Sequence, residues 1–399
     1  MLKQGTLAIH GGKPVRDSYL SYGRQWIDEE DIHAVVETLR SPFLTQGPKI
    51  KEFEDQIAKS TGAKYAVAFS NGTAALHAAC YAAGIRQGDE VITSPMTFSA
   101  SANCVRYCGG TVVFADIHPD TYNIDPAKVR SLITERTKAI IPVDYTGQPA
   151  DLDEIMAMAK EHHLVVIEDA AHSLGASYKG KPVGSIADMT MFSFHPVKHV
   201  TTGEGGVITT NSDEYYQRLL LFRSHGITRD QALMQHSLEG PWYYEMVDLG
   251  YNYRMTDMQA ALGITQLQKL DKFVARRREI AERYNSQFNR HPLTTIPYQA
   301  DDRNSSWHLY VIQLELEKLN ATRKEIFDAL VAENIGVNVH YIPVHFHPYY
   351  QAQGYRKGLA PEAERLYDRI LTLPLFPAMS DDDVNDVVEA VEKVLAAYS

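Results

Sequence analysis

Apolar positions along the chain follow two different spacings. Between residues 28 and 40 they recur every three or four positions, as on one face of a helix. From residue 65 onward short apolar runs alternate with helical stretches, and the strands we expect cover 65–69, 90–93, 111–115, 139–143, 164–167 and 207–210. The helices expected between them cover 73–83, 99–107, 126–133 and 151–163. This alternation predicts an α/β fold with a mostly parallel sheet covered on both faces.

The pattern changes in the last third of the chain. A charged helical segment covers 256–288, and residues 289–297 then hold two prolines and little periodicity, which is typical of a domain boundary. Beyond it we expect a strand at 307–314, a helix at 322–333, a strand at 337–341 and a closing helix capped by Ser380 with Asp383 three positions later. We divide the chain into an N-terminal arm (1–24), a large domain (25–288) and a small C-terminal α+β domain (289–399).

The charge balance excludes two classes of partner. The 399 residues include 39 Lys and Arg against 50 Asp and Glu, a net charge of −11, whereas a surface for nucleic acid or anionic lipid needs a basic stripe. The sequence has no apolar run of the roughly eighteen residues that a membrane helix needs. Its three cysteines, Cys80, Cys104 and Cys108, indicate free thiols in a reducing compartment. We expect a soluble cytoplasmic protein with no membrane span and no metal site.

Two segments at the ends of expected strands carry side chains suited to ligand binding. The strand at 65–69 runs through a small polar turn into an alanine-rich helix, so that backbone N–H groups at Gly72 and Thr73 can bind a phosphate. A second apolar strand ends in Glu168 and Asp169, where side chains face the ligand crevice of an open α/β sheet. Ordinary helix capping is the alternative for both segments.

A third segment places Lys198 among apolar and small residues, just before a glycine-rich stretch at 203–206. Burial lowers the pKa of an amine and favours the neutral form that imine formation needs, although pairing with a carboxylate is the alternative. Together, a phosphate cradle, an acid for a pyridinium nitrogen and an amine for a Schiff base have the logic of a pyridoxal phosphate site.

The motifs around these residues resemble those of a known family. They read SNGTAAL at 70–76, VIEDAAHSLGA at 166–176, FSFHPVKHVTTGEGG at 192–206 and GYNYRMTDMQAALG at 250–263. The chain resembles, from about residue 22 to residue 394, the fold-type I aminotransferases of nucleotide-linked keto-sugars known as the DegT and StrS group. The resemblance implies a large domain with a mostly parallel, seven-stranded type of sheet, pyridoxal 5'-phosphate as cofactor, and a homodimer with shared active sites.

The resemblance also implies the cofactor contacts. Lys198 attaches the cofactor covalently and moves a proton between the substrate carbon and the cofactor, and Asp169 bonds the pyridine nitrogen and keeps it cationic. The other expected contacts are an aromatic residue stacked on the ring, a partner for the ring hydroxyl and four phosphate ligands. In that order they are Phe98, His172, Gly72, Thr73, Ser193 and Asn252 of the partner subunit.

The expected substrates are a UDP-linked keto-sugar and L-glutamate. The strings YGRQWIDEEDI, RSHGITRD and PWYYEMVDLGYNYRMTD resemble the branch that aminates C4 of UDP-2-acetamido-2,6-dideoxy-β-L-arabino-hexos-4-ulose for pseudaminic acid. The resemblance implies most of the candidate substrate contacts, while Gln148 is a candidate by its position after a strand end and Arg229 by its guanidinium chemistry. The full set is Tyr22, Leu44, Thr45, Gln148, Arg229, Arg254, His340 and Tyr341. An Arg fork suits a carboxylate or a diphosphate, and for Arg229 a solvated loop charge is the alternative.

Three other functions stay open at this point. One is amination of a different sugar nucleotide, because spore-coat polysaccharide and dTDP-sugar aminotransferases have similar motifs. Another is a sugar dehydratase of the same fold, in which histidine replaces the Schiff-base lysine. The last is a regulatory protein that keeps the fold without turnover. The presence of both Lys198 and Asp169 favours the transaminase over the last two.

Overall fold

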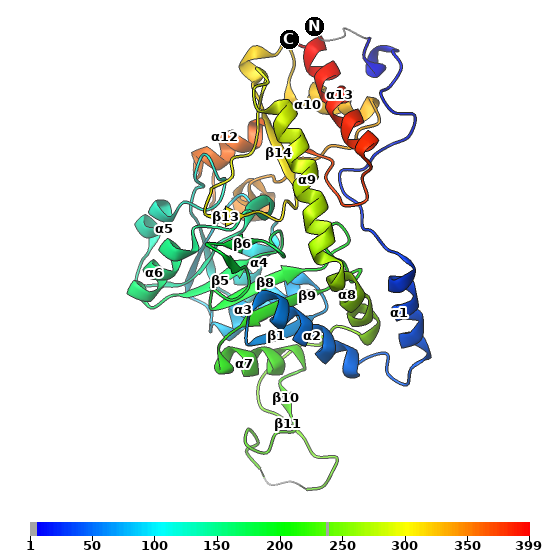
Figure 1. Ribbon diagram of the computed structural model, residues 1–399. Coiled ribbons are helices and arrows are strands. Elements are labelled where there is room, and N and C mark those ends of the chain that lie inside the picture. Colours follow the sequence, from blue (N-terminus) through cyan, green and yellow to red (C-terminus); the bar gives the residue numbers. More distant parts are fainter. Residues whose placement is uncertain (1–5, 237–238) are drawn as a thin grey trace.

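The computed structural model describes residues 6–236 and 239–399, and its centre is a seven-stranded sheet (Figure 1). The strands lie in the order β1-β9-β8-β5-β4-β2-β3. Strand β9 runs antiparallel to both of its neighbours, and every other pair in the sheet is parallel. The seven strands are β1 (Tyr65–Phe69), β2 (Glu90–Thr93), β3 (Thr111–Phe114), β4 (Thr137–Ile141), β5 (Val165–Asp169), β8 (Met189–Ser193) and β9 (Gly206–Thr210). The expected mostly parallel sheet is therefore confirmed.

Helices cover both faces of this sheet because its strands are apolar on both sides. In β1, Val67 and Phe69 pack into a core formed with α3, α4 and α7, whereas Ala66 and Ala68 face a core formed with α2 and α8. A further core beneath α5 and α6 covers the other end of the second face. The helices of these layers are α1 (Glu29–Arg40), α2 (Pro48–Thr61), α3 (Gly72–Ala82), α4 (Ala100–Tyr107), α5 (Pro126–Leu132), α6 (Leu152–His162), α7 (Asp213–Arg223) and α8 (Asp257–Gln268).

The C-terminal region has its own sheet and its own core. Strands β12 (Thr294–Thr295), β14 (Tyr310–Leu314) and β15 (Ile370–Leu373) pair antiparallel in that order. Helix α9 (Leu270–Phe288) runs from the large sheet to this region (Figure 1), where its second half packs with Leu7 and Leu20 of the N-terminal arm. The remaining helices are α10 (Arg323–Ala332), α11 (Pro348–Ala352), α12 (Pro361–Arg369) and α13 (Asp381–Ala397).

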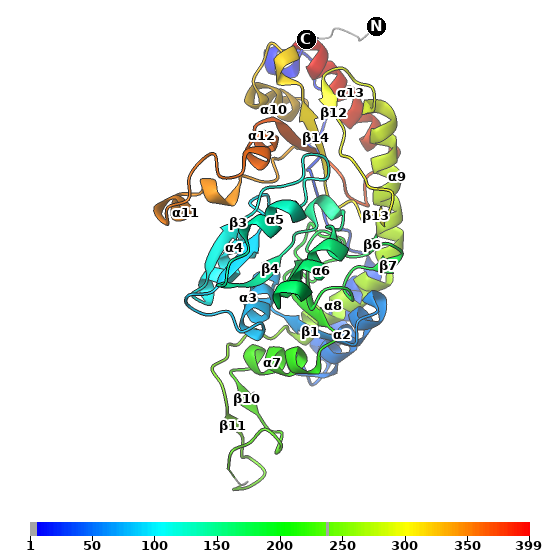
Figure 2. The same ribbon diagram turned by 90° about the vertical axis from the view of Figure 1, so that its left-hand side faces the viewer.

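Two small strand pairings lie outside these sheets. Strands β10 (Ile227–Thr228) and β11 (Glu245–Met246) form a hairpin that projects from the body beyond α7 (Figure 2). Strands β6 (Ser177–Tyr178), β7 (Lys181–Pro182) and β13 (Arg303–Asn304) form a short sheet near α6. No helix in the described part of the chain is long and apolar enough to cross a membrane.

Two of the elements expected from the sequence differ in the structure. The expected strand at 337–341 is absent: only Asn338 pairs with the sheet, through Thr372, and its side-chain oxygen then accepts the Val339 N–H, so the chain leaves the sheet. The expected single helix at 256–288 is two helices, because α8 ends at Gln268 and α9 begins at Leu270. The residue between them, Lys269, caps both helices, and its ammonium lies 3.0 Å from Asp31 of α1. The capping box of Ser380 and Asp383 at the start of α13 is confirmed.

Candidate active site

A cavity of about 870 Å³ lies where β1, β5 and β8 end. The carboxyl ends of parallel strands meet at one edge of the sheet, and the segments that leave these ends form the walls. The structure brings ten of the sequence-predicted residues together here, and they are Tyr22, Gly72, Thr73, Phe98, Asp169, His172, Ser193, Lys198, His340 and Tyr341. Residues from the N-terminal arm to position 341 thus share one site.

Lys198 lies on the loop after β8 and extends its amine into the cavity wall. Its Nζ atom lies 3.3 Å from Nε2 of His308. Burial lowers the pKa of the Lys198 amine to about 8, with Asp169 acting in the opposite direction and Arg277 adding to the decrease. At pH 7 about a tenth of this amine is therefore unprotonated and nucleophilic, far more than for an ordinary lysine.

Asp169 is the last residue of β5, and its carboxylate is buried at the cavity. One oxygen accepts a hydrogen bond of 2.6 Å from Ser101 Oγ, and the other accepts one of 3.2 Å from the Ala171 N–H. Burial raises the pKa of Asp169, while the bond from Ser101 lowers it. A cationic ring nitrogen placed against this carboxylate would supply the charge partner that the site otherwise draws from Lys198.

His172 follows three residues after Asp169 and stays uncharged. Its Nε2 atom lies 2.9 Å from the Tyr341 hydroxyl, and burial holds its pKa well below the usual range. Its Nδ1 atom is buried and has no hydrogen-bond partner within the described residues. A buried polar atom of this kind is costly unless a ligand satisfies it.

The start of α3 forms another part of the cavity wall. Asn71 caps this helix, because its side chain accepts the Ala74 N–H at 2.8 Å. The first backbone N–H groups of a helix have no acceptor within the helix and bind anions well. A Cβ atom at Gly72 would lie 3.3 Å from the Ser193 Cβ, so glycine is what allows the helix start to approach the Ser193 hydroxyl this closely.

Six predicted contacts are not among the residues that line this cavity: Leu44, Thr45, Gln148, Arg229, Asn252 and Arg254. Asn252 is exposed and pairs with Ser224 across a bridge, and Arg254 follows two residues later. Leu44 is 43% exposed and accepts the Asp257 N–H through its carbonyl. These residues lie on the outer surface of the chain.

Gln148 and Arg229 are engaged elsewhere. The buried Gln148 amide donates to the Tyr298 carbonyl at 3.1 Å and accepts the Ala300 N–H at 2.8 Å, so it holds a loop. Arg229 is exposed beside the projecting hairpin, with its guanidinium 5.5 Å from the centre of the Tyr244 ring. The structure does not bring either side chain to the cavity.

Two residues of the site escaped sequence reasoning. His308 contacts Lys198 and is uncharged, because burial holds its pKa well below the usual range. Arg277 of α9 donates to the carbonyl oxygens of Trp307, His308 and Leu375 at 3.3, 3.1 and 2.8 Å. Burial lowers the pKa of Arg277 to about 9. One signal in the sequence could have indicated His308, which is that this polar residue lies near the start of the mostly apolar run 307–314.

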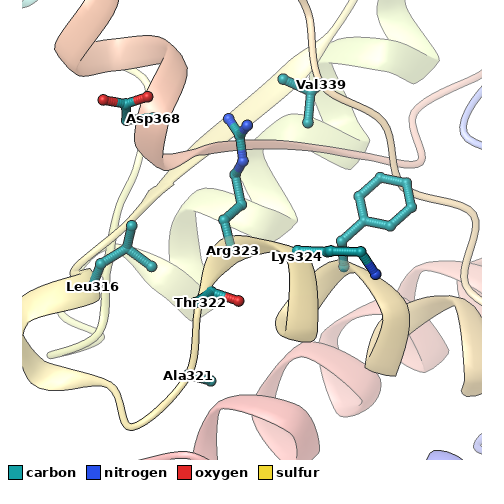
Figure 3. A pocket seen from close by; sticks show the side chains of 8 residues that line it. Leu316, Ala321, Thr322, Arg323, Lys324, Val339 and Asp368 are labelled. Atoms are coloured by element: carbon teal, nitrogen blue, oxygen red, sulfur yellow. The ribbon is translucent and has the colours of Figure 1, made fainter.

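A second hollow, of about 580 Å³, lies in the C-terminal region (Figure 3). Arg323 rises in it between Asp368 and Val339. The Arg323 guanidinium is occupied, since it lies 4.6 Å from the centre of the Tyr367 ring and donates to the Tyr367 carbonyl. Thr322 caps α10, so the polar groups of this hollow serve the fold.

Two of the three histidines of the 340–347 segment, His340 and His345, have side-chain partners within the protein. His340 Nδ1 lies 2.9 Å from the Thr372 hydroxyl, and His345 Nε2 lies 2.9 Å from a Glu364 oxygen. Residues 6–236 and 239–399 contain no group of three His, Cys, Asp or Glu side chains placed to hold a metal ion.

The donor set of the cavity fits pyridoxal 5'-phosphate. Asp169 faces the place of a ring nitrogen, the open Nδ1 of His172 can meet a ring hydroxyl, and the α3 start with Ser193 suits a phosphate. Phe98 lines the cavity and is 60% exposed, so its aromatic ring is available for a heterocycle to stack on. Fold and site together therefore define a pyridoxal phosphate enzyme of fold type I.

Comparison with known proteins gives the family. The chain belongs to the DegT/DnrJ/EryC1/StrS aminotransferase family, whose model matches residues 25–392. It is 48% identical over 382 residues, 95% of this chain and 98% of the relative, to the spore coat polysaccharide biosynthesis protein SpsC of Bacillus subtilis.

Solved structures agree with this family. Helicobacter pylori PseC, an aminotransferase involved in the biosynthesis of pseudoaminic acid, matches with a TM-score of 0.89 and 33% identity over 96% of this chain and all of that one. Spr1654 of Streptococcus pneumoniae in its PMP form has a TM-score of 0.89 and 34% identity over 95% of this chain and 99% of that one, and a PLP form is also similar. The protein is a pyridoxal phosphate-dependent sugar aminotransferase.

Proposed function

We propose that the enzyme transfers the amino group of L-glutamate to C4 of UDP-2-acetamido-2,6-dideoxy-β-L-arabino-hexos-4-ulose, for pseudaminic acid or a related glycan. The observation that carries the proposal is Lys198, with a pKa of about 8, in one cavity with Asp169 and the start of α3. The likeness to PseC over the whole chain supports the sugar and the pathway.

The chain's own residues account for the chemistry. When bound, the cofactor supplies an aldehyde that accepts amines and a ring that stabilises negative charge on the substrate carbon. With a substrate amine in its place, the Lys198 amine would be free to act as the base that moves a proton between the substrate carbon and the cofactor. Asp169 stabilises the protonated ring nitrogen, and His172 and His308 stay neutral, so they do not compete for the proton.

The sugar nucleotide enters past Tyr22, His340 and Tyr341. The Tyr22 and His340 rings are 5.2 Å apart, and His340 is fixed by its bond to Thr372. These groups provide a wall of aromatic and hydrogen-bonding atoms for a sugar or a uracil. Neither Arg254 nor Arg229 lines the cavity of its own chain, so these guanidinium groups would meet the diphosphate or a glutamate carboxylate only from a second subunit.

A second candidate substrate is the keto-sugar nucleotide of a spore-coat type polysaccharide. The 48% identity to SpsC over nearly the full length of both chains favours it. The retention of Lys198 and Asp169 in one cavity opposes a non-catalytic regulatory role.

We further propose a cytoplasmic homodimer in which Asn252 and Arg254 complete the site of the other subunit. Both residues lie outside the cavity of their own chain. Apolar side chains on and after α1 are unusually exposed: Ile32 by 47%, Leu39 by 55% and Phe43 by 51%. A second copy that covers them would bury this surface.

The substrate is tested by direct assay. Purified enzyme with L-glutamate is given the proposed UDP-4-keto sugar, its C5 epimer and a dTDP-linked 4-keto-6-deoxy sugar in separate reactions, and products are identified by mass and NMR. We expect C4 amination to be fastest with the first. Lys198→Ala, which lacks the amine, is the control and should give no product. Preference for either other sugar would refute the assignment while leaving the family intact.

A further inference from the structure

Three carboxyl groups meet behind the cavity at the end of β5. Asp144, Glu168 and Asp169 are exposed by only 0%, 0% and 5%. Asp169 faces Lys198, whereas Asp144 and Glu168 bond to hydroxyl and amide donors and to no cation within residues 6–236 and 239–399. Two adjacent buried carboxylates without a cation cannot both be ionised at low cost.

The hydrogen-bond donors around the two carboxyl groups show which carboxyl oxygen lacks a partner. Asp144 accepts from Ser173 Oγ at 2.5 Å and from the Ala150 N–H at 2.8 Å, so each of its oxygens has a donor. Glu168 accepts from Thr190 Oγ1 at 2.8 Å through Oε2, but its buried Oε1 has no partner in the described chain. The parallel bridge between Val143 and Asp169 puts the side chains of Asp144 and Glu168 on the same face of the sheet at the end of β5, and a hydrogen bond between these two carboxyl groups contributes to the pKa shift of each. A proton on Glu168 would satisfy this contact.

We infer that Glu168 is a neutral carboxylic acid that donates a hydrogen bond to Asp144, and that this pair positions Asp169 and His172 for the cofactor. The Glu168–Asp144 pair connects strand β5, strand β8 and the segment that follows β4, all close to the proposed place of the cofactor ring. Glu168 is bonded to Thr190 in β8, and it directly precedes Asp169 in β5. Asp144 bonds Ser173, the neighbour of His172, and its N–H donates to the Asp169 carbonyl at 3.1 Å.

The electrostatics agree with this proton position. Burial, together with the charge of Asp144, raises the pKa of Glu168 well above its usual range. Burial also raises the pKa of Asp144, but only to about 6, because bonds from Ser173, Ala150 and Glu168 favour its charged form. The titratable groups that face Glu168 are Asp144, from the segment after β4, and Asp169 on its own strand, while β8 presents the hydroxyl of Thr190. These opposite effects favour a charged Asp144 and a neutral Glu168.

Infrared spectroscopy tests the protonation state directly. At pH 8 exposed carboxyl groups are ionised, so a carbonyl band of a protonated acid in the holoenzyme must come from a buried residue. We expect this band in the wild type and in Glu154→Gln, a matched change at an exposed glutamate of α6, and its loss in Glu168→Gln. Absence of the band in the wild type, or its survival in Glu168→Gln, would overturn the inference. The measurement uses no sugar, so its outcome is independent of the proposed substrate.

Cofactor retention tests the positioning role, which rests on the proposed contacts of Asp169 and His172. Glutamine keeps an N–H for Asp144 and an oxygen for Thr190, so Glu168→Gln should change the dissociation constant of pyridoxal phosphate by less than about threefold. Glu168→Leu has neither group and should weaken binding by about tenfold or more. Equal weakening in both variants, or none in the leucine variant, would refute the role. If the leucine variant does not fold, retention by Glu168→Gln and the infrared band still decide.

Discussion

Lys198 is reactive because of what surrounds its amine. Asp169 is the acid that favours its protonated form, and four histidines nearby stay neutral because burial lowers their pKa: His172, His199, His308 and His340. Neutral imidazoles can accept or donate hydrogen bonds without adding charge. The amine is thus held in a polar but largely uncharged setting.

This setting gives the site a defined pH dependence. Only the neutral amine attacks the cofactor aldehyde, and with a pKa of about 8 the neutral fraction of Lys198 falls roughly tenfold per pH unit below that value. We expect the rate at which the apoenzyme combines with pyridoxal phosphate, followed by visible absorbance, to rise as pH increases from 6 to 8 and to level off above about 9. A rate independent of pH between 6 and 8 would contradict the lowered pKa. Lys198→Arg should show no covalent attachment after borohydride reduction.

The sequence predicted the residues that lie in motifs at strand ends and missed those that the fold brings in from afar. Lys198 and Asp169 could be predicted because the residues next to each in the sequence indicate its role: Lys198 lies among apolar and small residues, and Asp169 ends an apolar strand. His308 is 110 positions away from Lys198 along the chain. Its contact with Lys198 depends on how the 305–308 segment packs against the large sheet, which no local pattern encodes.

Strands buried on both faces are recognisable as short apolar runs, which is why most strands of the large sheet were expected to within a few residues. Strand β8 was missed, since its residues 189–193 lead directly into the lysine motif and include the polar Thr190. The structure shows that Thr190 is fully buried and bonded to Glu168. The segment at 337–341 has a strand-like composition, but only Asn338 pairs with the sheet, and His340 and Tyr341 line the cavity.

Helices α2 and α7 are fixed to the edge strand β1 by a buried ion pair. Arg223 of α7 donates to Glu54 of α2 at 2.5 Å and to the Ala68 carbonyl at 2.9 Å, and Glu54 also accepts the Ala68 N–H at 2.8 Å. The two side chains are exposed by 13% and 5%. Removal of one charge leaves the other buried without a counterion.

We therefore expect Glu54→Gln to lower the free energy of unfolding by about 3 kcal/mol. The loss should lie at the lower end of the usual range because Arg223 keeps its bond to Ala68. Asp55→Asn is the matched control on the same helix: it breaks an exposed pair with Lys51 and should cost less than about 1 kcal/mol. Urea denaturation measures both, and equal losses would contradict the special role of the buried pair.

The net charge of −11 describes the outer surface of the molecule and not the cavity. The proposed substrates and the cofactor are all anions, so positive potential must be local. Within the chain, Lys198 and the α3 start supply it. In the proposed homodimer Arg254 would add to it from the second subunit, and the complete electrostatic site would then be a property of the dimer.

Subunit complementation tests this arrangement. A heterodimer of Lys198→Ala and Arg254→Ala chains, purified through two different tags, has one site with both changes and one with neither if Arg254 acts across the interface. We expect about half of the wild-type activity, because one of two equivalent sites is intact. Each variant homodimer should be nearly inactive. If Arg254 served its own chain, both sites of the heterodimer would be damaged and no activity would return.

Arg277 bears on how the enzyme selects its substrate. Its guanidinium joins α9 to the carbonyl oxygens of Trp307, His308 and Leu375, and it is buried at the junction between the large sheet and the C-terminal region. A hinge motion that draws α9 away from these segments must break three bonds of a buried cation. The three bonds of Arg277 therefore favour a cavity whose walls keep their relative positions when a substrate binds. We expect such an enzyme to select its sugar by the shape of a preformed cavity.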